Sequence, residues 1–368
     1  MIGINELQYG GMLTTALMAL TLVLQVPRRA IRNKIFSRAR WMMAVGLALI
    51  SLQFLVQYIG GYRQMGVTQG VFWNLIFFMP CTICMNIALL YVQQKGHIKR
   101  LEWLLGVLLY VMALVLLVTT SIADGIPFEE ESAPLRTVEY IGAALFLAME
   151  GHYFVQLYKG YQRMRHAVDN YFDHERDDLL GWMGRSVTML AVITMFVPFA
   201  IFQEGWLLSA FACAFFFIIY YCASCFHSYG ISQDAQRVEE AERSQDSDEI
   251  EPTLGEADIK RVEKAVDKWV AAGGYLQPNQ TLSTVASDMD VQRYMLKAWL
   301  QQTKYGKLSN WLNTLRTEEA QRTMMEHPDW NLNAIADHCG FSRSTFHRVF
   351  HEITGETPSR YQERARID

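Results

Sequence analysis

Two segments of the chain, 50 residues apart, carry side chains that can hydrogen-bond to the edges of DNA bases. Both have Arg at the same position of the repeat, Arg293 in the first copy and Arg343 in the second. The predicted base-contacting residues are Gln292, Arg293, Tyr294 and Lys297 in the first copy and Arg343, Ser344, His347 and Arg348 in the second. Arg is suited to guanine, and Gln, Lys and Ser also bond to base edges in the major groove. A solvated helix face has a similar composition, but two such faces in register favour DNA binding.

The apolar positions repeat with the same offset and predict the helices that position these side chains. The i, i+3, i+4, i+7 spacing of one buried helix face is followed by Leu296, Trp299, Leu300 and Thr303, and again by Phe346, Val349, Phe350 and Ile353. A shorter helix is predicted before each, capped by a side-chain oxygen of Thr281 or Asn331. Asp290 and Gly340 occupy the intervening turns, where Gly takes a positive φ freely and Asp takes it at some cost. Each copy is therefore predicted to be a helix-turn-helix.

A longer amphipathic helix is predicted between the two motifs. Its apolar positions are Leu308, Trp311, Leu312, Leu315, Ala320 and Met324, and it ends near Pro328. This helix would set the distance between the two recognition helices. If both enter the same face of a duplex, that distance should be about 34 Å, one turn of DNA.

The C-terminal stretch, residues 257–366, resembles the AraC/XylS family of transcriptional regulators. The resemblance is carried by Asn331-Leu-Asn-Ala-Ile-Ala-Asp-His-Cys-Gly-Phe-Ser, by Phe346-His-Arg-Val-Phe, by Thr354-Gly-Glu-Thr-Pro-Ser-Arg-Tyr, and by the pair Leu315-Arg316 followed by Ala320. It implies a seven-helix domain whose recognition helices, residues 291–303 and 342–353, read adjacent segments of the major groove. It also implies a homodimer. The chain departs from the family pattern at Asp290, where Gly is usual, and in a stretch between Phe341 and Phe346 that is one residue shorter than the commonest form.

The first 230 residues have the composition of a membrane domain. The whole chain is 51% hydrophobic and 19% charged, and seven apolar runs have the length of about 20 residues that crosses hydrocarbon. These runs are residues 9–26, 41–59, 71–93, 101–121, 137–158, 186–202 and 206–226. Their length excludes a purely soluble enzyme. Six cysteines, most of them inside apolar runs, exclude a disulfide-built secreted domain, and an aromatic content of 12% excludes a disordered chain.

The basic residues predict how this bundle is oriented. Connections that alternate along the chain hold 14 Lys and Arg on one side, against Arg63 and Arg136 on the other. Because basic connections stay in the cytoplasm, the N-terminus is predicted outside and the C-terminal domain inside. No Lys or Arg precedes Pro27, which disfavours a cleaved signal peptide.

Residues 231–255 are predicted to be an acidic linker between the two domains. They hold 2 basic and 8 acidic residues. Two interpretations stay open: a solvated spacer, or a signalling helix that extends the seventh membrane helix and pairs with a second subunit. Residues 256–368 hold 15 residues of each sign, mixed at short range as on a soluble domain. The expected domains are therefore residues 1–230, 231–255 and 256–368.

Polar side chains inside the apolar runs are candidates for sensing a signal, because such groups are costly in hydrocarbon. The candidates are Glu150 and His152 in the fifth run, Cys81 and Cys84 in the third, and Cys222 and Cys225 in the seventh. Each Cys pair shares a helix face, which fits a soft metal or a redox switch. Packing as small apolar residues is favoured instead, because the two pairs lie at different depths. For Glu150 and His152, an interhelical hydrogen bond is favoured over a ligand site.

The sequence thus predicts an all-α protein, with a seven-transmembrane-helix bundle followed by a seven-helix domain that contains two tandem helix-turn-helix motifs. It contains no phosphate-binding loop, nucleophile elbow or zinc motif, and we expect no catalytic residues, cofactor or metal. The predicted function is a one-component transcription regulator in the bacterial inner membrane, which binds double-stranded promoter DNA from the cytoplasmic side. Further candidate partners are RNA polymerase, a small or lipid-soluble signal and a second copy of the chain. The alternatives are a transporter or channel with an appended DNA-binding tether, and a regulator whose membrane helices are only an anchor.

Overall fold

The computed structural model of the chain describes residues 4–25, 33–123, 132–173, 177–203, 205–232, 237 and 255–365. Over this part it is helical without strands, and an isolated antiparallel bridge pairs Phe172 with Thr281. The all-α fold class is confirmed. The chain divides into two compact units, one of Met1–Arg163 with Asp178–Ala235 and the other of Met164–Asp177 with Gln236–Asp368. The expected linker, residues 231–255, falls almost entirely outside the described residues, so its two interpretations and the domain boundaries stay predictions.

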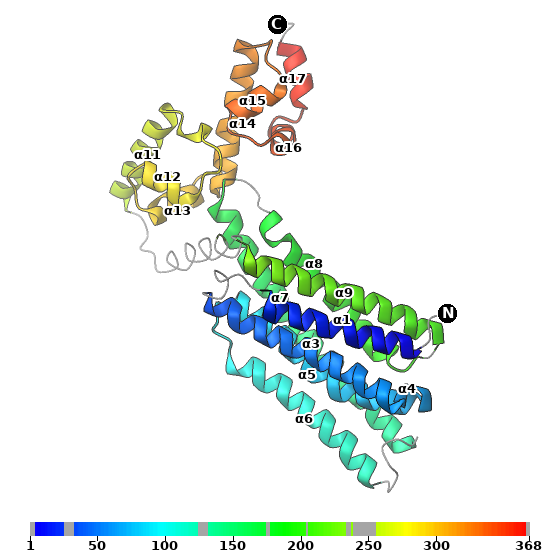
Figure 1. Cartoon of the computed structure of the whole chain (residues 1–368). Helices are drawn as coiled ribbons and strands as arrows, with labels where there is room; N and C mark the ends of the chain where they lie inside the picture. Colours follow the sequence, from blue (N-terminus) through cyan, green and yellow to red (C-terminus); the bar gives the residue numbers. More distant parts are fainter. Residues whose placement is uncertain are drawn as a thin grey trace. The chain divides into compact units, whose positions relative to one another are not determined.

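The first unit consists of long helices that lie side by side (Figure 1). They are α1 (Ile4–Leu24), α3 (Lys34–Gly60), α5 (Val67–Gln93), α6 (Arg100–Ala123), α7 (Ala133–Tyr171), α8 (Asp177–Ala200) and α9 (Gly205–Ile231), with the short α4 (Tyr62–Met65) after α3. Helix α3 packs against α1 and α5, while α6 packs against α5 and α9 against α1. Helix α7 begins in this unit, and its residues from Met164 onward belong to the second.

Six of the described helices are long and apolar enough to cross a membrane, namely α1, α3, α5, α6, α8 and α9. The fifth predicted span, residues 137–158, lies in α7, which is not among the six. We attribute this to Glu139, Glu150 and His152, which lower the hydropathy of α7. The six apolar helices expose many large apolar side chains, as expected of helices that face lipid.

The second unit is organised along α14 (Leu308–Glu326). One group of elements consists of α11 (Glu256–Ala271), a 3-10 turn η1 (Gly274–Leu276), α12 (Leu282–Asp288) and α13 (Arg293–Gln302). The other consists of α15 (Leu332–His338), α16 (Arg343–Thr354) and α17 (Pro358–Ala365). Both groups contact α14, and Figure 1 shows them on different stretches of it. The tandem arrangement of α12–α13 and α15–α16 agrees with the predicted repeat.

The local signals that define the two motifs act as predicted. The Thr281 hydroxyl accepts a hydrogen bond from the Thr284 N–H at 3.2 Å, and the Thr284 hydroxyl accepts one from the Thr281 N–H at 2.9 Å. The Asn331 side chain accepts a hydrogen bond from the Ala334 N–H at 2.8 Å. In the turns, Asp290 has φ +53° and Gly340 has φ +74°. The caps and the positive φ values therefore come from residues that sequence alone identifies.

The ends of the recognition helices differ from their predicted positions. Gln292 and Ser342 are N-caps with extended backbone, so the helices begin at Arg293 and Arg343, two residues and one residue later than predicted. The prediction that Ile353 is buried is wrong, because its side chain is 44% exposed. It lies in the last turn of α16, beyond the apolar cluster that buries the preceding turns.

Candidate nucleic-acid interface

The second helix-turn-helix, α15–α16, rests on an apolar core. The buried members of this core are Ala320, Met324, Ile335, Ala336, Cys339, Phe341, Phe346, Val349 and Phe350. A Cβ atom at Gly340, in the turn between α15 and α16, would collide with the carbonyl oxygen of Leu276. This close approach, together with the positive φ, explains why the turn contains glycine.

Three of the four predicted base-contacting residues of α16 have exposed side chains. Arg343, the first helical residue, is exposed, and so is His347 one turn later. Arg348 is also exposed and bonds to Glu352 at 3.1 Å and 3.2 Å. The side chain of Ser344 lies outside the described part of the structure. A recognition helix contacts bases mainly with its N-terminal residues, so Arg343 and His347 have the expected placement.

The corresponding residues of α13 are less exposed. Gln292 is an exposed N-cap whose side chain makes no capping bond, whereas Arg293, Tyr294 and Lys297 are half-buried. Arg293 is nevertheless the first residue of its helix, as Arg343 is of α16. The structure therefore keeps the predicted register of the two helices, and their base contacts stay a prediction.

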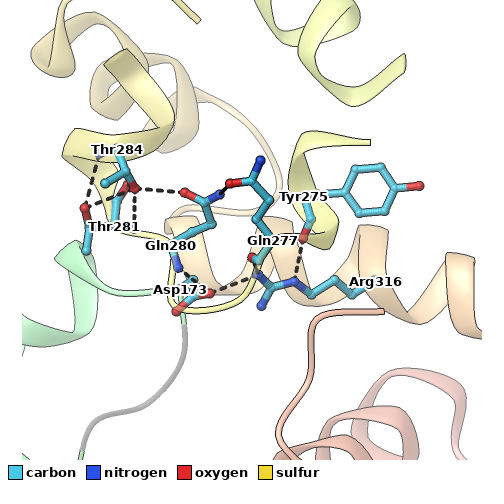
Figure 2. A network of polar contacts seen from close by, with 7 residues as sticks. All are labelled: Asp173, Tyr275, Gln277, Gln280, Thr281, Thr284 and Arg316. Atoms are coloured by element: carbon cyan, nitrogen blue, oxygen red, sulfur yellow. Dashed lines mark hydrogen bonds and ion pairs between the residues drawn. The ribbon is translucent and has the colours of Figure 1, made fainter. Parts of the chain in front are cut away.

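A buried polar network that sequence reasoning missed holds the segment in front of α12 (Figure 2). Its centre is an ion pair between Arg316 of α14 and Asp173, with 2.9 Å between Nη2 and Oδ2 and side chains that are 2% and 0% exposed. Arg316 also donates from Nε to the carbonyl of Tyr275 and from Nη2 to the carbonyl of Gln277, each at 2.7 Å. Asp173 Oδ2 accepts a further hydrogen bond from the Gln280 N–H at 2.9 Å. All five residues belong to the second unit.

Two other groups near this network have shifted pKa values. Burial raises the pKa of the Tyr275 phenol, and the phenol donates a hydrogen bond to Glu319 at 2.9 Å. Burial also raises the pKa of the Cys339 thiol to about 12, with a smaller contribution from the negative charge of Glu319. Cys339 is therefore an inert core residue and not a reactive thiol.

The structure separates Glu150 from His152, the two signal-sensing candidates of the fifth run. Glu150 is buried and accepts hydrogen bonds from the Asn86 amide at 3.2 Å and 3.1 Å. Together with Cys81 and Asn86, it lines a cavity of about 30 Å³. His152 instead pairs with Glu102, at 2.7 Å from Nε2 to Oε2. Sequence reasoning missed Glu102, which lies in the first turn of α6.

The four candidate cysteines are buried or half-buried in the described structure, and their role stays a prediction. Cys81 and Cys222 are buried, with sulfur contacts of 3.8 Å to Met85 Sδ and 3.9 Å to the Ser186 carbonyl. Cys84 and Cys225 are half-buried, and all four are free thiols. Among the described residues, no group of three or more His, Cys, Asp or Glu is placed to hold a metal ion.

A cluster of amides from α1, α3 and α5 lines one side of a second cavity, of about 60 Å³, whose other side is lined mainly by α8 and α9. Gln57 accepts from Gln8 at 3.2 Å and donates to Asn74 at 2.8 Å, and Gln53 donates to Asn74 at 2.6 Å. All four side chains are buried. These bonds satisfy most of the amide groups, which are costly in hydrocarbon when unpaired, while Gln53 Oε1 is buried without a hydrogen-bond partner.

Residues 325–363 match the model of a known family, described as bacterial regulatory helix-turn-helix proteins, AraC family. The matched range begins near the end of α14, includes α15 and α16, and reaches into α17. The first motif, α12–α13, lies outside it. No curated protein and no solved structure matches the chain.

Proposed function

Because residues 325–363 form a helix-turn-helix of the AraC family, we propose that the chain is a transcription regulator held in the bacterial cytoplasmic membrane. Its second unit binds double-stranded promoter DNA through α13 and α16, in a sequence-specific way. The family match over α15–α16 is the observation that carries this proposal, since it indicates DNA-binding transcription regulation.

The arrangement of the recognition helices supports DNA binding. Both helices begin at an Arg that occupies the same repeat position, Arg293 and Arg343. In α16 the side chains of Arg343, His347 and Arg348 are exposed, while the opposite face is packed into the apolar core. A helix that contacts base edges in a major groove must be anchored on one side and must expose polar residues near its N-terminus.

The six apolar helices support membrane attachment, and the distribution of basic residues supports an inward-facing DNA-binding unit. On this orientation the second unit faces the cytoplasm, where the chromosome is. We also propose that the first unit senses a small or lipid-soluble signal. The feature that supports sensing is the buried carboxyl of Glu150 at a cavity, because buried polar groups at membrane depth are costly and commonly functional.

The test of DNA binding is genome-wide crosslinking and precipitation of the full-length chain from intact cells. We expect sharp peaks that share a bipartite motif, with halves about one helical turn apart. In the Arg343→Ala variant these peaks should weaken. A matched control is Arg261→Ala, which removes an exposed Arg from α11 and should leave the peaks unchanged.

Two outcomes would contradict the proposal. Absence of enriched sites, for a chain verified to be folded and in the membrane, together with solute flux in vesicles, would support the transporter alternative. A reporter fusion that places the C-terminus outside the cell would exclude DNA binding altogether. Sensing is tested with the Glu150→Gln variant under the growth conditions that change transcription in the wild type. If the variant responds as the wild type does in every condition, a role for this carboxyl is excluded.

A further inference from the structure

The end of α7 is part of the DNA-binding unit. Helix α7 is continuous from Ala133 to Tyr171, and residues from Met164 onward cluster with residues 236–368. Over its last turns, Met164, Ala167, Val168 and Tyr171 are buried at the i, i+3, i+4, i+7 spacing of one helix face. Phe172 and Asp173 follow directly and are also buried. The C-terminal 110 residues of the chain are therefore not the whole of this unit.

Asp173 attaches this end of α7 to the segment that leads into the first helix-turn-helix. Its N–H donates to the Gln280 carbonyl at 3.0 Å, and its carboxylate accepts from the Gln280 N–H at 2.9 Å. Phe172 forms an antiparallel bridge with Thr281, the N-cap of α12. The Gln280 side chain continues the network by accepting from the Thr284 hydroxyl at 2.8 Å (Figure 2).

Arg316 links the same carboxylate to the second motif. Its guanidinium lies 6.0 Å from the ring centroid of Phe341, which follows the turn glycine of α15–α16. The same guanidinium donates to the Tyr275 and Gln277 carbonyls, which flank Leu276. Leu276 is in turn the residue whose carbonyl approaches Gly340. Arg316 thus contacts the segment in front of the first motif and the turn of the second.

A buried ion pair is tolerated because each charge satisfies the other, and removal of one partner leaves a buried charge without compensation. We propose that Asp173 is a positioning residue for DNA binding. By pairing with Arg316 and Gln280 at the end of α7, it fixes the first helix-turn-helix on α14 and so sets its distance from the second. This inference rests on the proposed function as a DNA-binding regulator. Any displacement of α7 would then change the spacing of α13 and α16.

The experiment uses the full-length chain in lipid nanodiscs and duplexes that the wild type enriches from a random-sequence pool. Binding is measured for the enriched duplex and for a duplex in which the two half-sites are separated by one additional base pair. We expect the wild type to bind the enriched duplex at least about tenfold more tightly, and Asp173→Ala to reduce this ratio to near one. Asp173→Asn keeps the shape of the side chain but removes its charge, and should give an intermediate ratio.

The ratio separates positioning from general stability. A variant that merely contains less folded protein loses binding to both duplexes equally, and its ratio stays at the wild-type value. The matched control is Asp169→Asn, which removes a carboxylate one turn earlier on α7, from a half-buried position. It should keep the wild-type ratio.

If Asp173→Ala fails to fold, Asp173→Asn alone decides the question. A folded Asp173→Asn or Asp173→Ala chain with the wild-type ratio overturns the inference and leaves the proposed function intact. If the wild type enriches no duplex, the proposed function fails and the positioning role fails with it.

Discussion

The two helix-turn-helix motifs share a sequence repeat but are held in place by different interactions. The second rests on an apolar cluster formed by α14, α15 and α16. The first also buries apolar side chains, among them Leu282, Val285 and Leu296. The segment that leads into it, however, is held by an ion pair whose partners are 143 positions apart in the sequence.

This difference separates a local motif from one that depends on a distant segment. The range that matches the AraC family covers the second motif, whose core is built from neighbouring residues. The first motif lies outside that range, and the segment that leads into it is bonded to Asp173, which follows α7. We infer that the second motif is held by its own core, whereas the first is held in addition by the end of α7.

The largest expected effect comes from Arg316→Met, which leaves the Asp173 carboxylate buried without its partner. Breaking a buried ion pair costs about 3–5 kcal/mol. We expect the opening free energy of residues 275–302 to fall by about this amount, and that of residues 343–354 to fall by less. Hydrogen exchange of the full-length chain in nanodiscs, resolved by peptide, measures both.

Arg322→Met is the control for this change, because Arg322 also lies on α14. Its side chain is 58% exposed and pairs with Glu319 at 2.8 Å. Exposed pairs contribute about 1 kcal/mol or less, so exchange in this variant should stay close to that of the wild type. If Arg316→Met reduced protection equally in both motifs, the first motif would not depend on this ion pair more than the second does.

The features that sequence predicts are those that neighbouring residues determine. Both caps and both turn conformations follow from residues inside each motif. In the sequence, Arg316 stands out only as one of the residues that carry the family resemblance. Its partner Asp173 belongs to no repeated or periodic pattern, so the ion pair is not predicted. In the same way, the pattern of apolar and polar residues in the membrane helices does not indicate which side chains pair between helices. The sequence therefore does not identify Glu102 as the partner of His152. That Glu150 and His152 have different partners could have been expected, since residues at i and i+2 face different sides of a helix.

The recognition helices provide the next test. Arg343→Ala should lose about 1–3 kcal/mol of specific affinity and relax the preference at one base position, if Arg343 reads a base. Arg293→Ala should lose less, near the lower end of this range, because Arg293 is half-buried while Arg343 is exposed. Titrations with the enriched duplex and with single-base variants measure both. A loss that is uniform over all sequences would identify a phosphate contact instead.

The N-caps are expected to have smaller effects. Replacing a capping Thr or Asn by Ala typically costs about 1 kcal/mol. Thr281→Ala should therefore weaken protection of α12, and Asn331→Ala that of α15, by similar amounts in hydrogen exchange. Because the Thr281 hydroxyl also donates to the Thr284 hydroxyl, which donates to the Gln280 side chain, replacement of Thr281 should further raise exchange at residues 275–280, with no counterpart before α15. Matching effects in the two variants would show that this link to Gln280 adds nothing to the cap.

The smallest effect, and one of opposite sign, is expected at the turn of the first motif. Asp290 has φ +53°, a conformation that glycine adopts without the steric cost of a Cβ atom, and Gly340 occupies the equivalent position of the second motif. Asp290→Gly removes that strain but increases the freedom of the unfolded chain, so the net gain should be at most about 0.5 kcal/mol. Gly340→Ala, by contrast, should destabilise its motif by more than about 1 kcal/mol, because of its φ and because the added Cβ would collide with the Leu276 carbonyl. Peptide-resolved hydrogen exchange compares the two changes. If Asp290→Gly destabilised the first motif, the stabilisation that the Asp side chain gives to this turn would exceed the cost of its backbone strain.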